Sequence, residues 1–158
     1  MKKYILTGLI LMSFLFVLSG CGGNDGIDLG PGGCVTAPVG SILNIQPGDF
    51  SKTDPDPASV HTTNFTISVT DENGIPLNDV LLWISYPFAV PDSSGRVQLY
   101  DGDVSKPSPM NVCTDVDGLY HLRFDYISGL VGEDPITYTG NLKAESGQAI
   151  DTVTVSIN

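Results

Sequence analysis

FTISVTDENGIPLNDVLLWIS, residues 65–85, decides the fold of this chain. Apolar and hydroxyl-bearing residues alternate strictly from Phe65 to Thr70, which is typical of a strand with one buried face. The next four residues, DENG, bond their own backbone or tolerate a positive φ and predict a turn. A second run follows, in which Leu81 and Trp83 make the row opposite Val80 partly apolar as well, so this strand is expected inside a sheet.

The same alternation recurs on both sides of this stretch. Further strands are predicted at 120–126, 136–145 and 153–157, with weaker candidates at 41–46 and 96–100. The runs DVDG at 115–118 and SGQ at 146–148 supply turns, and nowhere do apolar residues recur at helical spacing over three turns. About seven short strands with regular turns predict an all-β fold, an antiparallel β-sandwich.

The N-terminus has the pattern of an export signal. Lys2 and Lys3 precede an apolar stretch from Tyr4 to Leu18, which is too short for a membrane span, and the run ends in Ser-Gly-Cys21. It resembles a bacterial lipoprotein signal peptide. The resemblance implies removal of residues 1–20 and acylation of Cys21 with fatty acids such as palmitate.

The chain divides into three parts on this basis. Residues 1–20 are the signal, 21–38 are a lipidated Gly-rich tether, and 39–158 are the β-sandwich domain. The lipid implies a membrane-anchored protein of the cell envelope. The cysteine is followed by two glycines, whereas an Asp there tends to retain lipoproteins at the inner membrane of enteric bacteria. In an organism with two membranes, the outer one is therefore favoured.

Charge excludes one class of partner. Without Lys2 and Lys3, the chain has five basic and 18 acidic side chains, which gives it a formal charge of −13. Phosphate recognition needs clustered Lys and Arg, and the five basic residues are scattered singly, so we expect no nucleic-acid binding.

Two cysteines remain once Cys21 carries lipid. Export places Cys34 and Cys113 in a compartment where disulfides persist, and we expect them to be paired. The bridge would close a loop of about 80 residues and contribute on the order of 4 kcal/mol to stability. A free buried thiol is the competing interpretation. A metal site is disfavoured because His61 and His121 stand at no ligand spacing from the cysteines.

The stretch 65–85 also resembles the bacterial Ig-like modules of the invasin and intimin type, with their V-T-D-x-x-G-x-P turn between two strands. The runs 113–120 (CTDVDGLY) and 138–157 resemble a later turn and the closing hairpin of such modules. The resemblance implies an Ig-like sandwich from about residue 40. Two departures stand out: Cys34 precedes the first strand, and the chain has a single module. Trp83 is expected in or near the core.

Few residues suggest chemistry. Four aspartates offer oxygen ligands for calcium, but tight turns also demand Asp, and we favour the turn interpretation. These are Asp101, Asp103, Asp115 and Asp117. His61 and His121 would act as general bases only beside a carboxylate or nucleophile, and His121 is expected on a solvated strand face. No G-x-S-x-G elbow occurs. We therefore expect no enzyme, and no cofactor apart from the lipid.

One connection is apolar where a polar turn is expected. Tyr86, Phe88 and Val90 lie in a proline-rich loop that is either an interaction site or packed over the end of the sandwich. The function predicted is a non-enzymatic, lipid-anchored envelope protein whose Ig-like domain mediates protein interaction, adhesion or structural support, through loops or through strand addition at a sheet edge. The alternative is a surface module that binds a glycan or a divalent cation.

Overall fold

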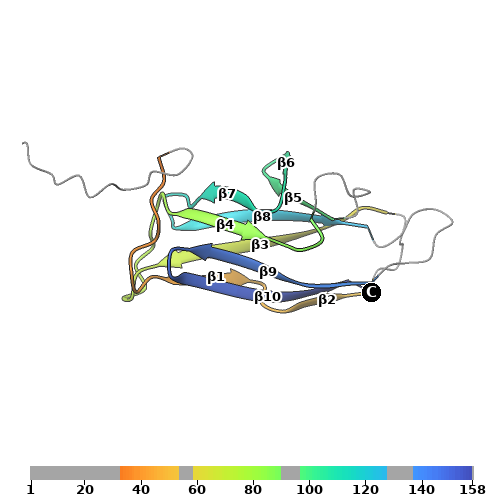
Figure 1. The fold of residues 1–158 in the computed structure, drawn as a ribbon, viewed down its shortest axis with the longest axis horizontal. Coiled ribbons are helices and arrows are strands. Elements are labelled where there is room, and N and C mark those ends of the chain that lie inside the picture. Colours follow the sequence, from red (N-terminus) through yellow and green to blue (C-terminus); the bar gives the residue numbers. More distant parts are fainter. Residues whose placement is uncertain (1–32, 54–58, 90–96, 128–136, 158) are drawn as a thin grey trace, which may run out of the picture.

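Strands alone make up the regular structure of the computed structural model, which describes residues 33–53, 59–89, 97–127 and 137–157 (Figure 1). Cys21 and the signal segment lie outside these residues. The strands of the described parts are β1 (Ile42–Gln46), β2 (Phe50–Lys52), β3 (His61–Thr70), β4 (Leu81–Ser85), β5 (Val97–Asp101), β6 (Val104–Lys106), β7 (Met110–Cys113), β8 (Leu119–Tyr126), β9 (Tyr138–Ser146) and β10 (Ala149–Ile157). Within the same residues, no helix is long and apolar enough to cross a membrane.

Two sheets face each other across the core. Sheet I has the strand order β1-β3-β8-β5-β6, and sheet II has the order β2-β10-β9-β4-β7. This places β3, β8 and β5 in one sheet and β4, β9 and β10 in the other, which is the arrangement of the ABED and CFG sheets in Ig domains. The molecule is an Ig-like β-sandwich, as the sequence predicts.

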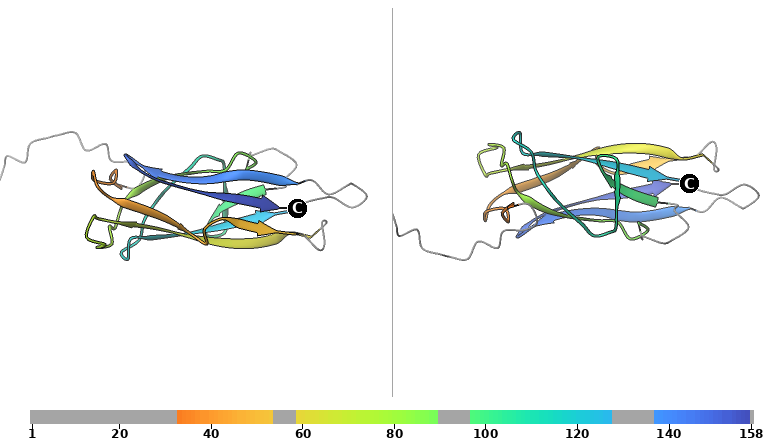
Figure 2. Two further views of the ribbon diagram at one scale, coloured as in Figure 1. Left: turned by 90° about the horizontal axis from the view of Figure 1, so that it is seen from below. Right: turned by 90° about the horizontal axis from the view of Figure 1, so that it is seen from above.

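The first two strands connect the sheets along one side. β1 is antiparallel to β3 in sheet I, whereas β2 runs parallel to β10 in sheet II (Figure 2). Aspartates hold this crossing: Ile45 donates its backbone N–H to Asp151 Oδ2 at 2.7 Å, and Thr154 donates its own to Asp49 Oδ1 at 2.7 Å. Among the strand pairs of the described residues, β2 and β10 are parallel and the others are antiparallel.

All seven predicted strands are confirmed, and three more are present in the described residues. The additional strands β2, β6 and β7 are only three to four residues long. Alternation over three residues does not differ from chance, so pattern analysis cannot find such strands. The predicted interior position of β4 is also confirmed, because it pairs with both β9 and β7.

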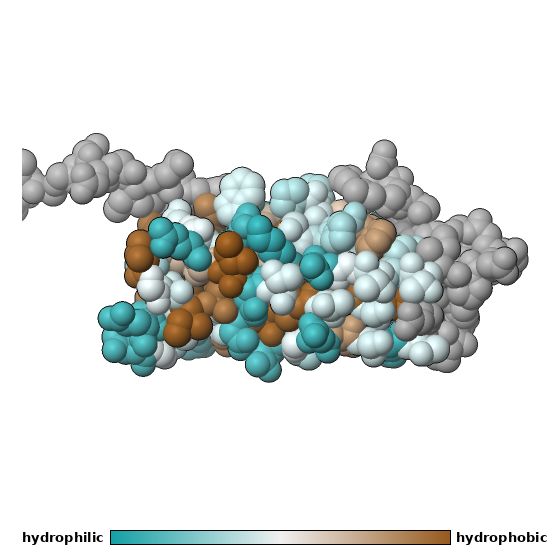
Figure 3. All heavy atoms as spheres, turned by 60° about the horizontal axis from the view of Figure 1, so that its bottom comes forward, coloured by the Kyte–Doolittle hydropathy of each residue, from teal (hydrophilic) through white to brown (hydrophobic). Residues whose placement is uncertain are grey.

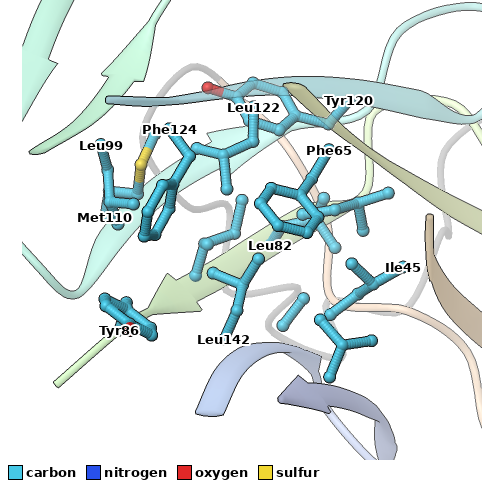
Figure 4. Close-up of a cluster of buried hydrophobic side chains, with 14 of the residues drawn as sticks. Ile45, Phe65, Leu82, Tyr86, Leu99, Met110, Tyr120, Leu122, Phe124 and Leu142 are labelled. Atoms are coloured by element: carbon cyan, nitrogen blue, oxygen red, sulfur yellow. The ribbon is translucent and has the colours of Figure 1, made fainter. Parts of the chain in front are cut away.

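The core consists of the inward rows of both sheets (Figure 4). Phe124 of β8 contacts the ring of Phe65 at a centroid distance of 5.9 Å and the ring of Tyr86 at 5.0 Å, both edge to face. Leu82 and Leu142 are fully buried on the sheet II side. Burial of these alternating apolar rows, at roughly 25 cal/mol per Å², is the main driving force that joins the sheets.

Candidate binding surfaces

A short N-terminal segment, residues 34–37, is tied to the sandwich before the first strand begins. Cys34 forms a disulfide with Cys113 of β7, with their Cα atoms 6.0 Å apart, which confirms the predicted pairing. Val35 donates its N–H to Asp79 O at 2.8 Å and accepts from Leu81 N at 2.8 Å. Because of these bonds, residues 34–37 of the predicted tether are attached to the sandwich.

Trp83 is not a core residue, contrary to the sequence-based expectation. It is 44% exposed on the outer face of sheet II, whereas Leu82 and Ile84 on either side of it are fully buried. Both rows of β4 are rich in apolar residues, so the sequence alone does not say which row faces inward. Leu81, on the same outer row, is buried beside the N-terminal segment, which accounts for the apolar character of that row.

The surroundings of Trp83 are polar. It lies opposite Asn111 on β7 and opposite Glu145 on β9. Lys143 forms an ion pair with Glu145, so their charges cancel beside the indole ring. Ile150 of β10 pairs with Glu145 and is also exposed. These five residues, which we call the Trp83 face, form a surface with one large aromatic side chain and no net formal charge.

The sheet edges are less suitable for binding. Among the described residues, the outermost strands are β1, β2, β6 and β7, each three to five residues long. Lys52 and Lys106 end two of them, and Pro107 and Pro109 directly precede β7. Short strands, lysines and prolines all disfavour addition of a further strand, so β-augmentation finds little support.

Asp101 and Asp103 are separated by their partners. Asp101 Oδ1 accepts a hydrogen bond from Tyr120 Oη at 3.1 Å, and Lys106 lies 3.7 Å from its other oxygen. Asp103 is fully exposed and lies 3.5 Å from Arg123. Burial, followed by the charge of Asp101, raises the pKa of Tyr120. Both aspartates thus have protein partners.

Asp115 serves the turn that the sequence predicts. Its Oδ1 accepts the backbone N–H groups of Asp117 and Leu119, both at 2.9 Å. Asp117 itself is exposed at the tip of this turn. In the described parts of the chain, no three His, Cys, Asp or Glu side chains come together as a metal site, so the calcium candidates are not brought into one cluster.

His121 lies on a solvated strand face, as predicted. It is exposed, and its Nδ1 lies 3.2 Å from Thr66 Oγ1. On the same face, Arg123 bonds Asp125 at 2.6 Å and lies 4.6 Å above the ring of Tyr100. The hydrogen bond to Asp125 raises the pKa of Arg123. On this face, His121 therefore has a hydroxyl neighbour, and Arg123 is held by Asp125 and Tyr100.

His61 lies at the start of β3 and stacks on Tyr126, with ring centroids 5.5 Å apart. It pairs with β8 five residues beyond the position of His121, so the two imidazoles do not converge. No pocket lies among the described residues.

The predicted interaction loop is largely packed. Tyr86 is a core residue at 1% exposure, and its hydroxyl donates to Val155 O at 3.4 Å. Phe88 is 39% exposed but packs edge to face on Tyr138 at 5.5 Å. Both rings lie over Gly140, where a Cβ would approach them within 3.2 Å. This glycine explains why the loop folds inward; Val90 lies outside the described residues.

Two solved structures are similar to this chain. No protein-family model matches the chain. No curated protein matches it either. A conjugative transposon lipoprotein from Bacteroides eggerthii aligns at 12% identity and a TM-score of 0.42, over 77% of this chain and 99% of its own. A PapD-like (ASH) domain of human CEP192 aligns at 12% identity and a TM-score of 0.43, over 78% of this chain and 89% of its own. Neither likeness assigns a function, partner or location to this chain.

Proposed function

We propose that this protein is a non-enzymatic, lipid-anchored component of a bacterial cell envelope whose Ig-like domain binds another protein through the Trp83 face. The observation that carries this proposal is that Trp83 is 44% exposed on β4, a strand with neighbours on both sides. Tryptophan is the residue most enriched among the hot spots of protein interfaces, where a central aromatic side chain is surrounded by polar groups.

The anchor follows from the N-terminal sequence. The run ending at Cys21 is of the lipoprotein type, and a glycine-rich stretch separates it from Cys34. The disulfide joins Cys34, which follows this stretch, to Cys113 of β7. A domain held in this way stays near the membrane while its sheet faces remain accessible. The likeness of residues 65–85 to invasin and intimin modules favours adhesion or structural support as its role, and the glycines after Cys21 favour an outer membrane.

A neutral glycan is the second candidate ligand. The Trp83 face carries one amide group and one ion pair beside an indole, and this pair leaves the face without net charge in a chain of net charge −11. A sugar ring can stack on such an aromatic surface while its hydroxyls bond the polar neighbours. The balance favours a protein because Ile150 adds exposed aliphatic area beside the ring.

Site-specific crosslinking in cells tests the proposal. A photoreactive residue replaces Trp83 in the full chain, and in a matched control it replaces His121 on the outer face of the opposite sheet. The expected result is a protein adduct from position 83 that position 121 does not give. Equal adducts from both positions, or none from position 83, would refute the protein-binding function, and an adduct to polysaccharide would favour the glycan.

A further inference from the structure

Three turns meet at the end of the sandwich where the N-terminal segment joins it (Figure 1). They are residues 38–41, 71–76 and 114–118. Val69 donates its N–H to Gly118 O at 2.9 Å, and a Cβ on Gly118 would lie 3.0 Å from Pro76, so the second and third turns are packed together. A Cβ on Gly40 would lie 3.8 Å from Glu72, which places the first turn beside the second. We call this continuous area the three-turn surface.

Branched aliphatic side chains project from each of the three turns. Val39 is 83% exposed, Ile75 is 59% exposed and Val116 is 84% exposed. Ile42, directly after the first turn, is exposed as well. Figure 3 shows most of the brown, apolar residues in this half of the molecule, next to teal hydrophilic ones, and mainly pale residues of intermediate hydropathy over the other half. Neighbouring exposed aliphatic residues are a mark of interaction sites, whereas single ones are ordinary.

The same turns carry only negative charge. Asp71 and Asp115 each accept two backbone N–H groups within their turns, and these bonds, that from Ile75 first, hold the pKa of Asp71 below its ordinary value. Those aspartates therefore have a structural role. Glu72 and Asp117 are exposed carboxylates beside the aliphatic tips, and no Lys or Arg occurs in the three turns.

We propose that the three-turn surface is a second docking site, separate from the Trp83 face, for a protein that presents Lys or Arg side chains next to aliphatic ones. Charge complementarity selects such a partner, because each basic group would meet a carboxylate while the aliphatic residues pack between them. A second copy of this chain presents the same negative charge and is repelled. An anionic lipid surface is repelled for the same reason, although the aliphatic tips would otherwise suit it.

The position of the surface limits where the partner lies. Val35 and the disulfide fix the N-terminal segment at this same end, so a partner on the three-turn surface would approach the domain from the side of the tether. The Trp83 face, on the outside of sheet II, would remain accessible. The domain would then connect two proteins, one on the tether side and one on the sheet face.

Crosslinking from Val116 in the full chain, expressed in its own cells, tests this site. The expected result is one protein adduct, mapped by mass spectrometry to a partner surface that contains Lys or Arg. The double variant Glu72→Lys with Asp117→Lys should lower its yield by about fivefold or more, since attraction becomes repulsion. Asp103→Lys is the control, because it reverses a fully exposed charge outside the three turns and should leave the yield unchanged.

Each other result overturns the proposal. An adduct that the double variant leaves unchanged would mean that charge does not select the partner. Loss of the adduct with Asp103→Lys as well would indicate a nonspecific charge effect. Adducts to lipid would assign the surface to the membrane, and the absence of any adduct would remove the site. None of these results affects the crosslink from position 83, so this proposal and the proposed function fail separately.

Discussion

At the scale of single residues, Gly118 is the most constrained position of the turns. Its φ is +70°, and a Cβ would lie 2.8 Å from both Leu77 N and Val69 O. Gly74 has a similar φ of +80°, but a Cβ there would meet no atom within 4 Å. A comparison of the two glycines therefore separates the energetic cost of a positive φ from the cost of a steric clash.

Gly118→Ala should lower the free energy of unfolding by about 2–4 kcal/mol, because it adds a backbone clash to the cost of a left-handed conformation. Gly74→Ala should cost only about 1–2 kcal/mol, the conformational part alone. Urea unfolding of both variants measures the difference. Equal losses would show that the third turn can move away from β3 and that the close packing is not required.

Tyr86 is expected to make the stability of the domain fall at alkaline pH. Burial raises its pKa to about 12 from an ordinary value of 10.0, with a smaller contribution from Tyr138. The unfolded chain loses this proton at a lower pH than the folded one, so the stabilisation is complete below pH 10 and is lost as the pH rises through about 12. Urea midpoints should therefore fall over this range.

Tyr86→Phe provides the comparison for that pH effect. It removes the titrating hydroxyl and its bond to Val155 O, so it should lower stability modestly at neutral pH and flatten the alkaline decline. An identical decline in the variant would assign the effect to other tyrosines, such as Tyr120.

At the scale of elements, the disulfide fastens the N-terminal segment to β7. It closes a loop across a separation of 79 residues. Replacing both Cys34 and Cys113 by Ser should lower the free energy of unfolding by about 4 kcal/mol, through the greater freedom of the unfolded chain. Thermal unfolding of the wild type with and without reductant, compared with the double variant, measures this. A variant as stable as the oxidised protein would contradict the expectation.

The crossing from β1 to β2 depends on a charged acceptor. Asp151→Ala leaves the N–H of Ile45 without its partner between the sheets and should cost about 1.5–3 kcal/mol, whereas Asp151→Asn keeps an acceptor and should cost less. Asp103→Ala, at a fully exposed side chain, is the control and should be close to neutral. Chemical denaturation of the three variants gives the order of their free energies of unfolding. If Asp151→Ala is also neutral, the sandwich closes without this bond.

At the scale of the whole molecule, we propose that Cys21 attaches the protein to the membrane. Cys21→Ser should abolish incorporation of labelled palmitate and leave the signal of residues 1–20 in place, because the thiol is the acceptor that the lipoprotein pattern requires. Labelling of cells followed by immunoprecipitation measures both effects. Label that still enters the variant would refute the lipid anchor, while the folded domain itself should be unaffected.

The sequence by itself determined the all-β class, seven strands, the two D-x-x-G turns and the pairing of Cys34 with Cys113. These features depend on local periodicity, on turn chemistry and on counting cysteines, and all three can be read along the chain. Only the tertiary structure decided which row of β4 faces outward, and hence that Trp83 is exposed. It also decided that Tyr86 fills the core and that the turns carrying Val39, Ile75 and Val116 lie beside one another. The physical reason is that burial depends on what packs against a residue, and for these positions that neighbour is distant in sequence.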